Sequence, residues 1–309
     1  MNKLIILIFI LLIACSKNEK NNKSKVSKLY DDKKIIEKEL NKDLKLTLST
    51  KIIINSIEEL KNNISRNHYN GTIESYSKFK FKKISTFYQN EPELIFEGKN
   101  TIFFNGKGAI IKFDDNSNVL WKKNHYSKAE KKSKPFLFLA KSKNILLITD
   151  NIANYYALDI LNGNLLWSKK NSSPFNSEIK VYRDKFYAVD LENTIHCFSI
   201  KSGEAIWKYK TDNFFIKAQK KLSIVINDNI LYFNNSIGDI TAINTEKGGL
   251  VWQYPTQNNQ IYGDSFLLKN SDLVINQNSI FFSNNKNEFY SLNKTNGILN
   301  WKQQINSYL

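Results

Sequence analysis

The sequence predicts an all-β fold, a β-propeller of four-stranded antiparallel blades, and two observations lead to this expectation. The first is that every tryptophan of the chain follows a similar local sequence and that they recur 40 to 49 residues apart; they are Trp121, Trp167, Trp207, Trp252 and Trp301. Self-similarity at a period of about 40–50 residues is the mark of propellers and solenoids. The second is that the residues before each tryptophan alternate between apolar and polar, as in half-buried strands.

Each repeat is expected to be a meander of strands joined by short turns. The second repeat has ILLITD, NYYALDI and NLLWSKK, and the third has KFYAVD, TIHCFSI and EAIWKYK. The fourth has ILYFNN, TAINT and LVWQYP, and the fifth has SIFFSN, EFYSLN and ILNWKQQ. A further strand is expected ahead of each, at PFLFLA, SEIKVY, KLSIVI and DLVINQ. Four antiparallel strands per unit make a propeller blade.

A glycine stands four residues before the tryptophan in four repeats, at Gly163, Gly203, Gly248 and Gly297. A tight hairpin turn needs a residue at positive φ, which glycine adopts at the lowest cost. The first repeat has Ser117 at this position, and we expect Asn116 or Asn118 beside it to take the left-handed conformation. The tryptophan then lies at a constant offset from the turn, where its ring can fill the gap between neighbouring blades.

The second repeat contains the pattern A-L-D-x-x-x-G-x-x-x-W intact, from Ala157 to Trp167. This pattern resembles the PQQ-like (quinoprotein) β-propeller repeat, and the resemblance covers residues 75–309. The Trp-Asp ending of another propeller class is absent, because each tryptophan is followed by Lys, Ser or Gln. Enzymes and non-catalytic scaffolds share the PQQ-like repeat, so the resemblance implies the fold more directly than the function.

The amino terminus has the features of an export signal. Residues 1–14 combine Lys3 with a short apolar run, which is typical of a signal peptide. Leu12 to Cys15 resembles the lipobox of bacterial lipoproteins, so we expect lipidation at Cys15, with an ordinary secreted protein as the alternative. Residues 15–29 are polar and rich in Lys and Asn, as in a flexible tether. Residues 30–74 are expected to form a helix and strand segment ahead of the repeats.

No catalytic, cofactor-binding or metal-binding residue is predicted. The quinone enzymes that share the repeat need calcium, a catalytic Asp and usually a vicinal Cys-Cys pair, and this chain has only Cys15 and Cys197. Cys197 is expected to be a small buried residue. The three histidines have no partner at metal-ligand spacing, and His196 is expected to pack within a strand. The net charge of +16 does not favour nucleic-acid binding in an exported protein without a binding module.

A lipid-anchored propeller without catalytic groups is similar to the BamB-type lipoproteins of the outer-membrane β-barrel assembly machinery. The resemblance implies a periplasmic scaffold that binds a subunit of that machinery. The alternatives are a ligand- or polysaccharide-binding propeller lipoprotein and, less favoured, a PQQ-dependent dehydrogenase. Propellers of this type have eight blades, which need about 345 residues, whereas five are visible in 309. The chain is therefore expected to be an incomplete ring, a smaller propeller, or one in which some blades lack tryptophan.

Overall fold

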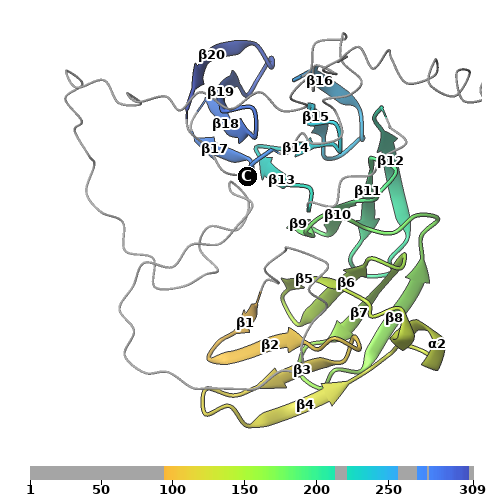
Figure 1. Ribbon diagram of the computed structural model, residues 1–309. Coiled ribbons are helices and arrows are strands. Elements are labelled where there is room, and N and C mark those ends of the chain that lie inside the picture. Colours follow the sequence, from red (N-terminus) through yellow and green to blue (C-terminus); the bar gives the residue numbers. More distant parts are fainter. Residues whose placement is uncertain (1–93, 213–220, 257–269, 277, 306–309) are drawn as a thin grey trace, which may run out of the picture. The chain divides into compact units, whose positions relative to one another are not determined.

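The computed structural model describes residues 94–212, 221–256, 270–276 and 278–305, which all belong to one compact unit spanning Lys38–Leu309. Within these ranges the regular secondary structure is β-strand apart from one short helix (Figure 1). The predictions for the signal peptide, the lipidation site Cys15, the tether and the segment 30–74 lie outside the described residues.

The strands form five sheets, here called blades 1 to 5 in chain order. Blade 1 contains β1 (Ile95–Glu97), β2 (Asn100–Phe104), β3 (Ile110–Phe113) and β4 (Val119–Lys123). Blade 2 contains β5 (Leu137–Ser142), β6 (Ile145–Asp150), β7 (Asn154–Asp159) and β8 (Leu165–Lys170). Blade 3 contains β9 (Lys180–Tyr182), β10 (Lys185–Val189), β11 (Thr194–Ser199) and β12 (Ala205–Lys210). Blade 4 contains β13 (Ile224–Asn227), β14 (Ile230–Asn234), β15 (Ile240–Asn244) and β16 (Leu250–Tyr254). Blade 5 contains β17 (Val274–Asn276), β18 (Ser279–Asn284), β19 (Glu288–Asn293) and β20 (Leu299–Gln304).

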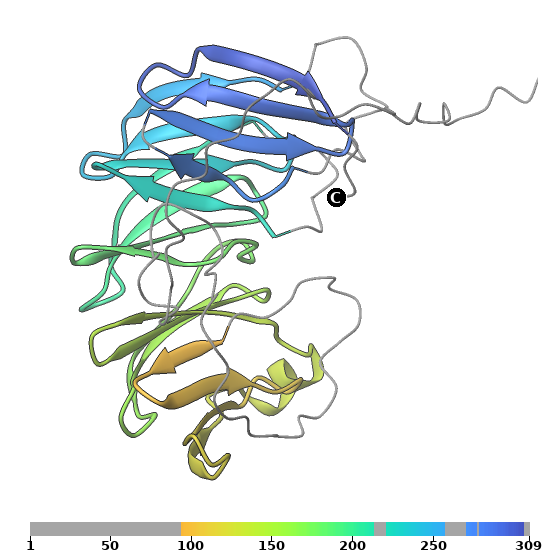
Figure 2. The ribbon, with the colours of Figure 1, turned by 90° about the vertical axis from the view of Figure 1, so that its left-hand side faces the viewer.

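Every blade is an antiparallel meander in which each strand pairs with the next one in the chain (Figure 2). The first strands of neighbouring blades contact one another: β1 with β5, β5 with β9, β9 with β13 and β13 with β17. Because strands alternate in direction, the turns between the first and second strands and between the third and fourth strands lie at the same end of a blade. The predicted all-β fold of five four-stranded antiparallel blades, with an extra strand ahead of blades 2 to 5, is confirmed.

The core lies between neighbouring blades. One apolar cluster joins side chains of blades 1, 2 and 3, a second joins blades 3 and 4, and a third joins blades 4 and 5. The middle strands are therefore covered on both faces, and β6 and β11 are buried along most of their length. The alternation of exposed and buried residues that the sequence suggested is absent there, because a second blade covers the face that a two-layer sheet would leave in water.

The helix, α2 (Lys128–Lys132), follows blade 1 and was not predicted from the sequence. It begins with a capping box. The Ser127 hydroxyl accepts a hydrogen bond from the Glu130 amide, and the Glu130 carboxylate accepts one from the Ser127 amide at 2.8 Å. The spacing Ser-x-x-Glu is a sequence signal for a helix start, so this element could have been predicted. No helix in the described part of the chain has the length and apolar content needed to cross a membrane.

Candidate protein-docking surface

The joints between blades use one repeated contact, in which a tryptophan packs on the last turn of the following blade. The indole Nε1 donates to a backbone carbonyl three residues before that turn's glycine. The four donor–acceptor pairs are Trp121 with Ile160 (3.2 Å), Trp167 with Ile200 (3.0 Å), Trp207 with Thr245 (3.0 Å) and Trp252 with Lys294 (3.0 Å). A buried indole N–H needs an acceptor, and a turn carbonyl of the next blade provides it.

The glycines of these turns have two roles. Gly163, Gly203, Gly248 and Gly297 all take φ between +68° and +71°. A Cβ atom built on any of them would also lie 2.5–2.8 Å from an atom of the preceding blade's indole ring. Glycine is thus required both for the turn and for the close approach of the ring.

Blade 1 departs from this pattern. Ser117 itself takes φ +68°, so the expectation that Asn116 or Asn118 would carry the left-handed conformation is wrong. The Asp114 carboxylate accepts hydrogen bonds from the amides of both asparagines, at 3.0 and 2.8 Å, which hold them in the turn beside Ser117. At the other end of the array, Trp301 on β20 is 39% exposed, against 9% for Trp121 and 8% for Trp252.

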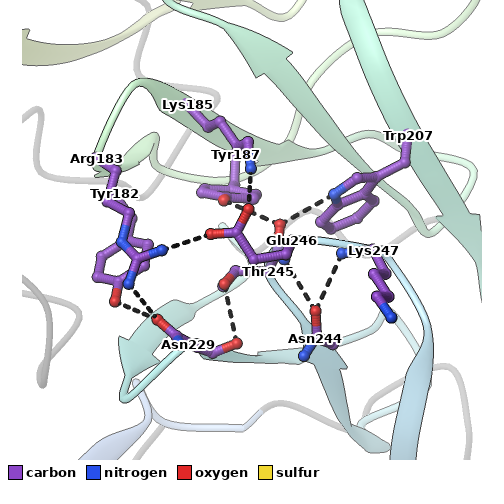
Figure 3. Close-up of polar contacts among 10 residues, drawn as sticks. All are labelled: Tyr182, Arg183, Lys185, Tyr187, Trp207, Asn229, Asn244, Thr245, Glu246 and Lys247. Atoms are coloured by element: carbon purple, nitrogen blue, oxygen red, sulfur yellow. Dashed lines mark hydrogen bonds and ion pairs between the residues drawn. The ribbon is translucent and has the colours of Figure 1, made fainter.

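The joint between blades 3 and 4 adds a charged cluster to the tryptophan contact (Figure 3). Arg183 lies in the first turn of blade 3, and its Nη1 contacts Glu246 Oε1, in the last turn of blade 4, at 2.7 Å. Arg183 Nη2 donates to Asn229 Oδ1 at 3.1 Å, and Lys185 Nζ contacts the second oxygen of Glu246. We call Arg183, Lys185, Asn229 and Glu246 the interblade clasp.

The clasp holds an exposed arginine in a fixed orientation. The Arg183 guanidinium lies 5.1 Å from the centre of the Tyr182 ring, whose hydroxyl donates to the same Asn229 oxygen at 2.5 Å. The Arg183 side chain is still 55% exposed. The hydrogen bond from Lys185 lowers the pKa of Glu246, and the same bond raises the pKa of Lys185, so these two groups stay charged at neutral pH.

The choice of arginine at this position is informative. The chain has 45 basic residues, of which only Arg66 and Arg183 are arginines. A guanidinium presents a planar fork that can contact a carboxylate and an amide at once and stack on a ring, whereas a lysine ammonium cannot. Exposed ion pairs add little to stability, about 0–1 kcal/mol each, so the clasp serves to orient Arg183 more than to hold the blades together.

The opposite end of the blades carries a second repeated motif, which the sequence analysis missed. An Asn or Asp begins the turn between the second and third strands of every blade: Asn105, Asp150, Asp190, Asn235 and Asn284. Its side-chain oxygen accepts from the amides two and four residues later, for example from Ile152 and Asn154 at 2.9 and 2.7 Å. These residues stand 17 positions before the tryptophan in blades 2 to 5 and 16 before it in blade 1. The constant offset was a signal that could have found them.

Two buried acid clusters at this end are structural. Asp190 Oδ2 contacts His196 Nε2 at 2.8 Å, and the Phe198 ring stacks on the imidazole at 5.4 Å. A His–Asp pair also orients the base of a catalytic triad, but this imidazole is 5% exposed and its remaining partners are Asn171 and Phe175. In blade 2 the Tyr126 hydroxyl donates to Asp150 at 2.7 Å, and burial raises the pKa of Asp150.

The described residues contain no group of three or more His, Cys, Asp or Glu side chains that could hold a metal ion. Cys197 is a free, buried cysteine, as expected, and burial raises the pKa of its thiol to about 12. A thiol in this state is a packing group rather than a nucleophile.

Residues 106–309 match the family model described as "Outer membrane protein assembly factor BamB". The chain belongs to this family. No curated protein matches the sequence.

Among solved structures, BamB from Moraxella catarrhalis is similar, with a TM-score of 0.53 and 16% identity over 70% of this chain. The chain spans 64% of that BamB, less than two thirds of its length. A quinohemoprotein alcohol dehydrogenase from Pseudomonas putida HK5 is similar with a TM-score of 0.56 and 15% identity, over 73% of this chain and 43% of that enzyme. A europium-containing methanol dehydrogenase gives a TM-score of 0.55 and 12% identity, over 68% of this chain and 50% of that enzyme.

At these identities the likeness to BamB and to the dehydrogenases shows a shared fold and nothing about a shared reaction. Membership of the BamB family rests on the sequence model, which covers blades 2 to 5 and the last two strands of blade 1, β3 and β4.

Proposed function

We propose that this protein is a non-catalytic scaffold, lipid-anchored at Cys15 to the outer membrane and facing the periplasm, that binds a subunit of the β-barrel assembly machinery. Membership of the BamB family and the lipobox ending at Cys15 support this role. Two or more acyl chains on one residue give stable anchoring, unlike a single chain. The chain then supplies a binding surface rather than a reaction.

We infer that the partner docks at the interblade clasp. Tyr and Arg are the residue types most enriched at interface hot spots, and here Tyr182 and Arg183 are adjacent, stacked and held by Asn229 and Glu246. An exposed arginine that is already fixed loses little rotamer freedom on binding, and this raises affinity. The turns at this end of the blades are therefore the docking surface.

The experiment is recovery of partners from detergent-solubilised envelopes with the full-length chain as bait. The wild type should recover a subunit of the β-barrel assembly machinery, and Arg183→Ala should not recover it. Arg183→Lys should recover much less of this subunit than the wild type does, because lysine lacks the planar guanidinium fork. Lys143→Ala is the matched control, since Lys143 is exposed and takes positive φ at the same turn position of blade 2. Equal recovery by Arg183→Ala and Lys143→Ala would overturn the docking site, and tightly bound quinone and calcium would overturn the non-catalytic role.

The anchor has its own test. Cys15→Ala should move the protein from the membrane pellet to the soluble fraction, because the acyl chains have no other attachment point. Ser16→Ala, next to the lipidated position, should remain in the pellet. If Cys15→Ala stayed in the membrane pellet, lipid anchoring at Cys15 would be contradicted, and the proposed docking site would be unaffected.

A further inference from the structure

The last strands of blades 1, 2 and 3 combine exposed apolar residues with lysines. These strands, β4, β8 and β12, lie at the sheet edges opposite the first strands, through which neighbouring blades contact one another. They contain no Asp or Glu. Their exposed side chains include three apolar residues, which are 46–52% exposed, and three lysines; we call these six residues the basic rim: Leu120, Leu166 and Ile206 with Lys122, Lys170 and Lys208.

The lysines of the rim are not required by the blade fold. In the three positions after each tryptophan, blades 1 to 3 carry six lysines, whereas blades 4 and 5 carry one. Blade 4 has Gln253 and Tyr254 there, and its last strand still pairs with the third strand through the same β-bulge. Lys122 and Lys208 also form no ion pair with another described residue. Packing therefore does not account for these lysines.

Apolar and basic side chains alternate from blade to blade along the rim. A Cβ built on Gly163, just ahead of β8, would lie 2.7 Å from Lys123 Cγ at the end of β4. Lys169, near the end of β8, pairs at 2.5 Å with Glu204, just ahead of β12. The basic end of one strand thus lies beside the apolar start of the next, and the two kinds of side chain form one surface.

The helix α2 adds lysines to this surface. Asn154 Nδ2 donates to Glu130 Oε1 at 3.1 Å, and Asn154 is the strand partner of Lys170. The helix therefore lies beside the basic end of β8. Its Lys128 and Lys132 are exposed and form no ion pair with another described residue.

The rim is unsuited to pairing with another strand. The β-bulge of each edge falls at the apolar residue of the rim, since the ladder skips Leu120, Leu166 and Ile206. Bulges and lysines on an edge strand disfavour the addition of a further strand. Whatever covers the rim must therefore meet its side chains rather than its backbone.

An anionic lipid surface suits both kinds of side chain. Exposed leucine and isoleucine can enter the boundary between headgroups and acyl chains, while lysines extend towards anionic headgroups. A highly charged polymer such as a nucleic acid would pair with the lysines but would gain little from the apolar residues. The combination at the rim therefore favours a membrane.

We propose that the basic rim docks on a membrane surface that contains anionic phospholipid. The rim lies along the strand edges and the interblade clasp lies in the turns, so lipid and a protein partner use different residues. The inference depends neither on the proposed partner nor on the anchor. Salt screens such attraction at physiological ionic strength, so the rim orients the protein on the membrane, and release of Cys15→Ala to the soluble fraction is still expected.

A lysine footprint tests the docking on the full-length, processed protein. The protein is mixed with vesicles of phosphatidylcholine alone or with added phosphatidylglycerol, at low ionic strength. Amines are acetylated briefly, and mass spectrometry measures the labelling of each lysine. The three rim lysines should be labelled more slowly on the anionic vesicles, whereas Lys143 and Lys201, exposed in turns at the clasp end, should be labelled equally on both. Equal labelling of the rim lysines on both vesicles would overturn the proposal.

Charge variants separate the rim from a general effect of net charge. Each lysine near an anionic surface contributes about 1 kcal/mol, so the ratio of docked to undocked protein should fall about fivefold for each rim lysine replaced by glutamine. The labelling rates of Lys128 and Lys132 report this ratio. The test and its matched control are Lys122→Gln/Lys170→Gln/Lys208→Gln and Lys143→Gln/Lys201→Gln/Lys247→Gln. An equal effect of the two triple variants would overturn the proposal, as would protection that appears only when solubilised envelope proteins are added.

The apolar residues of the rim have their own control in blade 4. Leu166→Ser/Ile206→Ser should weaken the protection of the rim lysines. Leu250→Ser/Val251→Ser should not, because these residues are similarly exposed, at 48% and 45%, but no lysine follows them on their strand. Equal effects of the two variants would overturn a lipid-facing rim.

The failure of the anchor can be distinguished from the failure of the rim. A processed protein that does not sediment with vesicles of phosphatidylcholine alone lacks the anchor, yet anionic vesicles should still protect its rim lysines. A protein that sediments with both kinds of vesicle but shows no protection of the rim keeps the anchor and overturns this proposal.

Discussion

The adjacent glycines of the blade 4 turn give the sharpest test of the joint. In Gly248→Ala the new methyl would lie 2.5 Å from Trp207 Cδ2, at a residue with φ +69°. The left-handed conformation costs a non-glycine residue about 1–2 kcal/mol, and forcing a group into a packed site costs about 1–3 kcal/mol. Gly248→Ala should therefore lower the free energy of unfolding by about 2–5 kcal/mol. A Cβ on Gly249 meets nothing within 4 Å, so Gly249→Ala should change it by less than about 1 kcal/mol.

Urea denaturation followed by circular dichroism, on matched full-length proteins, measures both values. Gly98→Ala separates the two costs, because Gly98 takes φ +58° in open space and reports the backbone cost alone. The excess of Gly248→Ala over Gly98→Ala is then the part due to the indole ring. If Gly248→Ala were no more destabilising than Gly249→Ala, the ring would not lie against this turn and the description of the joints would be wrong.

Two further predictions use the same denaturation assay. Trp207→Ala should lower the free energy of unfolding by about 3–5 kcal/mol, because it removes the indole ring from between blades 3 and 4 together with its hydrogen bond to the Thr245 carbonyl. A decrease of only about a few tenths of a kcal/mol would show that the ring is not packed there. Asp190→Asn should keep the turn, because Asn235 at the equivalent position of blade 4 accepts the same two hydrogen bonds from turn amides. Burial raises the pKa of Asp190, but the bond from His196 and the turn amides outweigh it, so the pKa lies below 3.8. The stability advantage of wild type over Asp190→Asn should thus be full above pH 3.8 and vanish as the pH falls further; a constant difference would contradict this.

Most of the fold could be predicted from the sequence repeat, because every blade makes the same contacts within itself and similar contacts with its neighbours. A hairpin glycine and a tryptophan at constant offset made the blades visible without any structural information. The burial of the middle strands was predicted less well. Alternation of apolar and polar residues predicts a strand with one buried face. In this fold neighbouring blades cover both faces of the middle strands.

The candidate docking site could not be predicted from the sequence. Arg183 and Glu246 are 63 positions apart, and neither belongs to the repeat pattern. They meet because the first turn of one blade and the last turn of the next lie at the same end, and this adjacency follows only once the strands are paired. The rarity of arginine in the chain was the one available signal, and it has meaning only when the partners of the guanidinium are known.

The joint places strict demands on only a few positions of each blade in this chain. Each joint between blades needs an indole ring, a turn carbonyl and a glycine, whereas the exposed residues of the turns do not take part in this contact. The similar structures are 12–16% identical to this chain at TM-scores of 0.53–0.56, so the fold is shared although few residues are identical. The same freedom allows one repeat to serve dehydrogenases and assembly factors. Function must then be sought in residues that break the repeat, and Arg183, exposed and held by a neighbouring blade, is such a residue.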